Sequence, residues 1–153
     1  MKKKIISLLS ALALTAQIVP CALADNDVKV YVNDTEMITD APIIIENNRT
    51  LVPVRAILEY LDYNVDWDGA TQKVTIAKDE TTLNLIIGDT QATRDIIYKG
   101  NTHSYKNPLE VAPQIINDST YIPLSDVANA FRLNITWDGD NREVHITQYK
   151  KGD

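Results

Sequence analysis

One pattern of apolar and polar positions occurs twice along the chain, with a shift of 70 positions. The triplet Trp67-Asp68-Gly69 recurs as Trp137-Asp138-Gly139, and no gap is needed between residues 45 and 76 of the first copy. Apolar residues also fall opposite apolar residues: Val52 and Ile122, Val54 and Leu124, Ile57 and Val127, Leu61 and Phe131, Val65 and Ile135. Chance does not preserve both spacing and chemistry over such a stretch, so we interpret the chain as two copies of one unit.

Each copy predicts the same order of elements. An apolar strand and a polar turn lead to a short strand that ends at Pro53 or Pro123, whose fixed φ and missing N–H suit the first position of a helix. Apolar residues then recur at helical spacing over 54–61 and 124–131, which predicts a short helix with one buried face. After the helix the period changes to two, and an Asp-Gly turn followed by a returning apolar strand predicts a β-hairpin.

The segments outside the two copies predict strands only. Alternating apolar residues place strands at 28–32 and 83–87, and a turn at Asn33-Asp34 predicts a returning strand at Met37-Ile38. One or two further short strands are expected within 90–106. No linker rich in Pro, Gly or Ser separates the copies, and one copy alone is too small to bury its apolar face. We therefore predict one α+β domain over residues 25–148, in which two pseudo-repeated strand–turn–helix–β-hairpin units form antiparallel sheet packed on two short helices. A polar tail follows at 149–153.

The first 24 residues have the composition of a secretory signal peptide. Three lysines, an apolar run at 5–19 and the small-x-small site Ala22-Leu23-Ala24 predict cleavage after Ala24. Two alternatives stay open: an uncleaved membrane anchor, against which Pro20 and the short run argue, and lipidation of Cys21, for which Pro20 is a poor neighbour. We therefore expect a secreted, extracellular protein, with association to the cell wall as an alternative location.

Cleavage would leave a strongly acidic chain. The sequence has 15 Lys and Arg against 21 Asp and Glu, and residues 1–24 include three lysines and no acid, so the mature net charge is 12 − 21 = −9. Such a charge repels nucleic acids, anionic membrane surfaces and polyphosphate wall polymers. Cys21 is the only cysteine, so the mature chain has no disulfide and depends on packing for its stability. No later run is apolar enough to predict a membrane span.

Arg49 and Arg55 are the candidate binding residues. Arg55 falls in the first turn of the first helix, where the helix dipole disfavours a cation, so Glu59, Asp66 or Asp68 is expected to compensate its charge. Both arginines are absent from the second copy, which suggests that they act together. Two interpretations stay open: an ion-pair network that fixes the helix to the sheet, or an arginine pair that binds a ligand.

The other candidate sites favour structural roles. Trp67 and Trp137 share a strand face with apolar neighbours and are predicted to lie in the core. The run Asp138-Gly139-Asp140-Asn141 is as rich in oxygen ligands as a calcium loop, but Asp-Gly is typical of a hairpin turn, which we predict here. His103 and His145 lack a further ligand at useful spacing, so we expect no metal and no cofactor. Motifs for nucleophilic, zinc, thiol or phosphate chemistry are missing, and we predict no enzyme activity.

Two long strings carry a family resemblance: NNRTLVPVRAILEYLDYNVDWD and NDSTYIPLSDVANAFRLNITWD. They resemble the two halves of the copper amine oxidase N-terminal-like domain, also called the stalk domain. The resemblance implies a secreted or surface module that, in the namesake enzyme, stands apart from the copper site and supplies no ligand. Ser119 and Ser125 stand where the family repeats its arginines, and Asp62 and Arg132 stand where it places glycine after each helix. Because Arg adopts a left-handed helix stop less readily than Asp does, the second helix end is the less certain one.

These observations predict a non-catalytic secreted or cell-surface interaction or stalk module. We expect it to bind an envelope or extracellular protein through an exposed strand edge or a groove. An open alternative is a module that binds carbohydrate or peptidoglycan through exposed aromatic side chains, for which the candidates are Tyr60, Tyr63, Tyr98, Tyr105 and Tyr121. Self-association into a homo-oligomer is a third hypothesis, and a secreted hydrolase is the remaining class.

Overall fold

The computed structural model describes residues 27–149 of the chain. The predicted signal peptide at 1–24 and residues 150–153 of the predicted tail lie outside the described residues. The described residues form thirteen strands in three sheets, together with two helices, α1 (Val54–Tyr60) and α2 (Leu124–Phe131). The prediction of an α+β fold is therefore confirmed. The order strand–strand–helix–strand–strand occurs in both halves of the chain.

The central sheet, sheet B, joins the two halves. Its order is β10-β11-β4-β3, with bounds β3 (Ile44–Glu46), β4 (Arg49–Pro53), β10 (Gln114–Ile116) and β11 (Ser119–Pro123). β4 and β11 run antiparallel, and Val52 lies opposite Ile122, which is the equivalent residue of the other half. The flanking pairs, Leu51 with Pro123 and Pro53 with Tyr121, exchange under the same shift of 70 positions. The register therefore places a local two-fold axis between Val52 and Ile122.

Each helix begins directly after a strand of sheet B. Pro53 and Pro123 cap the helices instead of opening them, because their ψ angles of 101° and 118° keep them extended. The helices thus begin one residue later than predicted. Each helix stops at a left-handed residue, Asp62 with φ 61° after α1 and Arg132 with φ 57° after α2. Arg132 therefore takes the conformation for which the family is expected to use glycine.

The hairpin after each helix starts a separate outer sheet. Sheet C has the order β5-β6-β7-β8-β9, with bounds β5 (Asn64–Asp68), β6 (Lys73–Lys78), β7 (Thr81–Ile86), β8 (Gln91–Tyr98) and β9 (Asn101–Pro108). Sheet A has the order β12-β13-β1-β2, with bounds β1 (Lys29–Val32), β2 (Thr35–Met37), β12 (Leu133–Asp138) and β13 (Glu143–Gln148). The strands expected outside the two copies are β1, β2, β7, β8 and β9, and all of them are present.

The expectation of purely antiparallel sheet was wrong for one pair of strands. β1 pairs with β13 in parallel, with Val30 opposite Val144 and Val32 opposite Ile146. β7 occupies the equivalent place beside β6 but runs antiparallel, with Leu85 opposite Val74. The difference follows from connectivity, since β7 follows β6 after a tight turn whereas β1 comes from the other end of the described chain.

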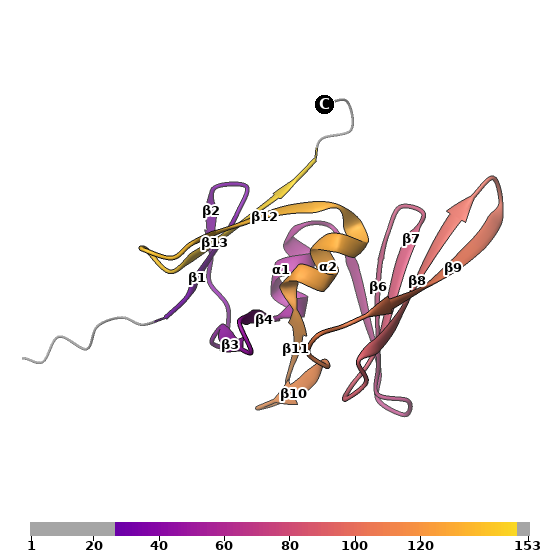
Figure 1. The fold of residues 1–153 in the computed structure, drawn as a ribbon, viewed down its shortest axis with the longest axis horizontal. Helices are drawn as coiled ribbons and strands as arrows, with labels where there is room; N and C mark the ends of the chain where they lie inside the picture. Colours follow the sequence, from indigo (N-terminus) through magenta and orange to yellow (C-terminus); the bar gives the residue numbers. More distant parts are fainter. Residues whose placement is uncertain (1–26, 150–153) are drawn as a thin grey trace, which may run out of the picture.

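The apolar core lies where the helices meet the three sheets. Figure 1 shows α1 and α2 between the strands of sheet A on one side and those of sheet C on the other. Each outer sheet contributes two fully buried residues from its returning strand, Val74 and Ile76 in one and Val144 and Ile146 in the other. Ile57 and Leu58 on α1 belong to the same cluster. One continuous core therefore joins both halves of the chain.

Candidate functional site

Arg55 lies on the exposed side of α1. Its side chain is 61% exposed, and Nη1 lies 3.7 Å from Oε1 of Glu59, one turn further along the helix. The prediction that Glu59 compensates the Arg55 charge is therefore confirmed. Within residues 27–149 no ion pair joins Arg55 to Asp66 or Asp68. An exposed pair of this kind contributes only about 0.3–0.5 kcal/mol, so it does not fix the helix to the sheet.

Arg49 lies at the start of β4 and forms an ion pair with Glu110. The hydrogen bond to this carboxylate raises the pKa of Arg49. Asp126 on α2 lies near the pair, and burial followed by the charge of Glu110 raises its pKa, against a lowering by Arg49. The two candidate arginines line different grooves, described next, so the structure does not bring them together in one site.

The Trp67 groove separates α1 and β5 from the β10–β11 turn of the other half. It has a volume of about 540 Å³. Its floor is made of buried apolar residues: Pro53, Val54, Val65 and Val74. Its charged lining residues are Asp40, Arg55, Glu59, Asp66 and Asp118. Four carboxylates against one guanidinium give this groove a net charge of 1 − 4 = −3.

The Trp137 groove is its equivalent on the other half of the chain. It has a volume of about 410 Å³ and separates α2 and β12 from the β3–β4 turn. Its floor is made of buried apolar residues: Leu124, Ala128, Leu133 and Val144. Its polar lining residues are Asn48, Arg49, Thr50, Ser125, Asn129 and Asn134. Most lining residues of one groove correspond to those of the other under the shift of 70 positions, but Arg49 is the only charged residue here.

The prediction that both tryptophans lie in the core is wrong for Trp137. Trp67 is partly buried and packs against the core, whereas Trp137 is 47% exposed. The helix residues that line the two grooves differ in length, since Ser125 and Asn129 of α2 stand at the positions of Arg55 and Glu59 of α1.

Each indole lies against the glycine of its own Asp-Gly turn. A Cβ at Gly69 would lie 3.5 Å from Nε1 of Trp67, and a Cβ at Gly139 would lie 3.3 Å from Nε1 of Trp137. The second distance is shorter than a normal carbon–nitrogen contact, so an alanine there would displace the indole. The Trp-Asp-Gly triplet thus combines a tight turn with a close approach of the indole to the backbone.

The grooves lie beside free strand edges. β5 is an outer strand of sheet C and β12 is an outer strand of sheet A. The N–H of Ile87 donates to the carbonyl of Gln72 at 3.0 Å. Because hydrogen-bonded pairs alternate in an antiparallel ladder, the backbone groups of positions 74, 76 and 78 also bond to β7. The positions between these, 73, 75 and 77, bond to β5, where their partners are residues 68, 66 and 64. The N–H and C=O groups of Val65 and Trp67 therefore point away from β6.

The same alternation holds on the other half. The N–H of Lys29 donates to the carbonyl of Arg142 at 3.0 Å, which assigns positions 142, 144 and 146 of the chain to the pairing with β1. The outward groups of β12 therefore belong to Ile135 and Trp137. Each groove thus presents a tryptophan side chain and unpaired backbone groups of the same strand.

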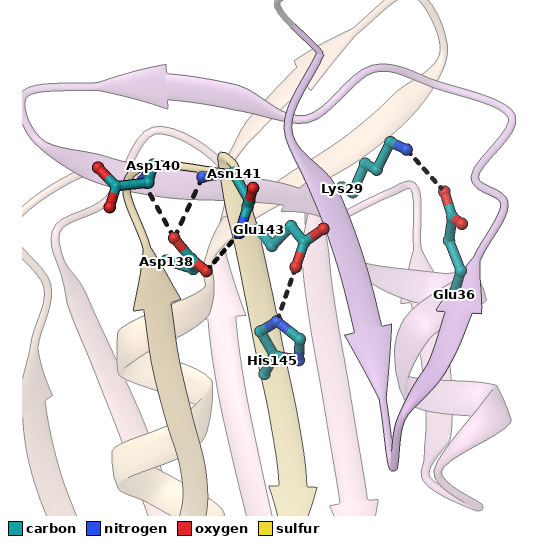
Figure 2. A network of polar contacts seen from close by, with 7 residues as sticks. All are labelled: Lys29, Glu36, Asp138, Asp140, Asn141, Glu143 and His145. Carbon is teal, nitrogen blue, oxygen red and sulfur yellow. Dashed lines mark hydrogen bonds and ion pairs between the residues drawn. The ribbon is translucent and has the colours of Figure 1, made fainter.

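The Asp-Gly turns bind their own backbone. Asp138 accepts hydrogen bonds from the N–H groups of Asp140 and Asn141 at 3.0 and 3.1 Å, and from the Asn141 amide at 2.9 Å, as Figure 2 shows. Asp68 accepts similar bonds from Ala70 and Thr71. These bonds lower the pKa of both aspartates. The predicted hairpin turn is confirmed, and its carboxylate oxygens are engaged within the turn.

The two histidines lie in different sheets. His145 on β13 stacks on Tyr31 of the adjacent parallel strand, with ring centroids 4.9 Å apart, and its Nε2 lies 3.1 Å from Oε2 of Glu143 (Figure 2). His103 is exposed on β9. In the part of the chain that the structure describes, no group of three or more His, Cys, Asp or Glu side chains is arranged to hold a metal ion.

Two of the five tyrosines expected at the surface are buried instead. Tyr121 is 1% exposed and its hydroxyl donates to the carbonyl of Pro42 at 2.8 Å. Tyr63 is 6% exposed and packs edge to face against Phe131. Burial raises the pKa of Tyr63 to about 12, partly opposed by a hydrogen bond with Gln148. The other three of the five candidates are at least 48% exposed and remain available to a ligand: Tyr60, Tyr98 and Tyr105.

Reasoning from the sequence missed both grooves. The signal was present in the sequence, because the two halves of the chain differ at positions 55, 59, 118 and 119, and these positions are among those that line the grooves. The sequence did not show that β4 pairs with β11. This pairing places the turn of each half beside the groove of the other half.

Comparison with known proteins supports the resemblance found in the sequence. The family model of the copper amine oxidase N-terminal domain matches residues 31–146. This match covers nearly all the described residues, including both helices and both grooves. No curated protein matches the sequence of the chain. Within residues 27–149, no helix is long and apolar enough to cross a membrane.

Proposed function

Because the chain belongs to the copper amine oxidase N-terminal domain family, whose domain is a non-catalytic module, we propose that it is an interaction module that acts outside the cell. In this proposal residues 1–24 are a cleaved signal peptide, and the two halves are copies of one unit. The mature chain binds an envelope or extracellular protein. The binding involves no enzymatic reaction and no cofactor.

One observation carries the proposal: within residues 27–149 no strand pairs with the outer edge of β5, which lies beside Trp67 at the side of a groove with an apolar floor. An open edge strand is a template for pairing with another chain. An extended segment of a partner can add to such an edge, with main-chain hydrogen bonds for affinity and side-chain pockets for specificity.

The test is capture of proteins from an envelope extract with residues 25–153 as bait. The variant Trp67→Pro removes the outward N–H and the indole, while Trp67→Val removes only the indole, so the pair isolates the contribution of the strand edge. Neither variant breaks a bond to β6, because the backbone groups of residue 67 point away from it. We expect a saturable partner that Trp67→Val weakens and Trp67→Pro abolishes. The proposal is wrong if no saturable partner binds at micromolar concentration.

A second candidate function is glycan binding in the Trp137 groove. Trp137 is 47% exposed beside neutral side chains that suit sugar hydroxyls, among them Asn48, Thr50 and Asn134. An indole of this kind offers its face to the apolar side of a sugar ring. Sedimentation with purified cell wall decides this candidate. We expect Trp137→Ala to leave the protein in the supernatant and Trp67→Ala to pellet like the parent protein.

A further inference from the structure

We infer that the Trp67 groove binds an extended polypeptide segment that carries a lysine or arginine and adds as a strand to the free edge of β5. This inference rests on the proposed function and names the chemistry of the partner. The Trp137 groove has the same architecture but a different charge, so it serves as an internal control within the molecule.

Three of the four acids of the Trp67 groove are not required by its architecture. At the positions equivalent to Glu59, Asp66 and Asp118, the other half of the chain has the neutral residues Asn129, Thr136 and Asn48. The second half folds in the same way without these charges. The net charge of −3 is therefore a property of this groove alone and is complementary to a cation.

The Trp137 groove also shows where a cation fits. Arg49, which lines that groove, forms an ion pair with Glu110, which does not line it. At the equivalent positions of the Trp67 groove stand Ser119 and Asp40, and both line it. Among residues 27–149, no ion pair joins Asp40 or Asp118 to a cation of the chain itself. A lysine or arginine of the bound segment would take the place that Arg49 holds beside Glu110.

The remaining features of the groove fit an extended segment better than a small cation. The outward N–H and C=O groups of Val65 and Trp67 can bond to a partner strand. Successive side chains of that strand would point alternately toward the apolar floor and away from it. Trp67 lines the groove, so an ammonium or guanidinium group of the bound segment would lie near its indole. β5 has five residues, so a segment of about five residues would match its length.

The test uses a single tryptophan as reporter. Trp67 and Trp137 are the only tryptophans of the chain, so the Trp137→Phe variant of residues 25–153 reports binding near Trp67 by its fluorescence. The probes are capped heptapeptides in which valine alternates with lysine, glutamine or glutamate. We expect the lysine peptide to bind about tenfold more tightly than the glutamate peptide, from one ion pair and one cation–π contact, and to weaken as salt is raised.

Matched variants distinguish binding of the lysine peptide in the Trp67 groove from its general electrostatic attraction to an acidic protein. Asp40→Asn with Asp118→Asn should remove most of the preference for lysine. Glu110→Gln with Asp138→Asn makes the same change in net charge on the other half, and it should leave the preference unchanged. Trp67→Pro lacks the reporter and is therefore measured by titration calorimetry. It should weaken all three peptides, because it removes a backbone donor of the strand edge.

The outcomes distinguish this inference from the proposed function. Equal affinity for the lysine and glutamate peptides, or equal loss in both double variants, would overturn the cationic partner while strand addition to β5 stands. If none of the peptides binds but the envelope extract still yields a partner sensitive to Trp67→Pro, the cationic segment is wrong and the proposed function survives. If neither peptide nor extract binds, both fail.

Discussion

The left-handed backbone of Arg132 offers a direct test of how α2 ends. Arg132 has φ 57° and ψ 44°, and its N–H donates to the carbonyl of Ala128. A side chain with a Cβ is strained by roughly 1–2 kcal/mol in this conformation, whereas glycine is not. The side chain of Arg132 is exposed and forms no ion pair within residues 27–149, so little is lost with it.

The change Arg132→Gly should therefore stabilise the protein. Relief of the strain is opposed by the greater entropy of glycine in the unfolded chain, which costs about 0.4–1 kcal/mol. The expected net gain is about 0.5–1 kcal/mol. With a urea m-value of about 1.5 kcal/mol/M, this raises the midpoint of unfolding by about 0.3–0.7 M without a change in m.

Two control variants make the urea measurement decisive. Asn129→Gly lies in the interior of α2 and should destabilise the protein by a few tenths of a kcal/mol, about the difference in helix propensity. Asp62→Gly changes the equivalent stop of α1 and should stabilise less than Arg132→Gly, because Asp tolerates the left-handed region better. The reasoning is refuted if Arg132→Gly lowers the midpoint while Asn129→Gly behaves as expected.

Three further predictions concern the core, a buried tyrosine and a turn. Ile122→Ala should destabilise the protein by about 2–5 kcal/mol in urea unfolding, because this fully buried side chain lies at the two-fold axis, whereas exposed Ile45→Ala should cost under about 0.5 kcal/mol. Tyr63 keeps its proton in the folded state up to a pKa of about 12, against 10.0 for the unfolded chain, so its contribution to stability should be intact below pH 10 and lost as the pH rises toward 12. Tyr63→Phe should remove that part of the alkaline decline, and an unchanged decline would contradict the assignment. Asp138 has a lowered pKa, so its contribution is present above the unfolded value of 3.8 and is lost as the pH falls through the lower folded value. Asp138→Ala should therefore destabilise the protein at neutral pH and lose its effect in acid, as thermal unfolding across the acid range would measure.

Local features of the sequence predicted most of the elements. The helices after Pro53 and Pro123 and the strands of both hairpins follow from short-range periodicity and turn residues, which act over a few positions. The helix starts were one residue early, because a proline at the end of a strand and one at the start of a helix look alike in sequence. The stop at Arg132 was in doubt because its conformation contradicts the propensity of the residue.

The tryptophans show where periodicity stops being informative. Trp67 and Trp137 share the alternation that predicts a buried strand face, yet only Trp67 packs against the core. The two halves differ outside the strand, since the helix residues that line the grooves are Arg55 and Glu59 in one half and Ser125 and Asn129 in the other. The alternation of apolar and polar residues predicts which face of a strand a side chain occupies. It does not predict whether another element buries that side chain.

By itself the sequence determined the helices and strands, their order in each half and the family. Helices and strands depend on residues close together in the chain, and the family depends on runs of residues that match its pattern. Only the tertiary structure decided which strands pair, that β1 joins β13 in parallel, and that Arg49 and Arg55 line different grooves. The physical reason is that pairing across the two-fold axis at Val52 and Ile122 joins segments about 70 residues apart, and no local pattern records which turn will lie beside which helix.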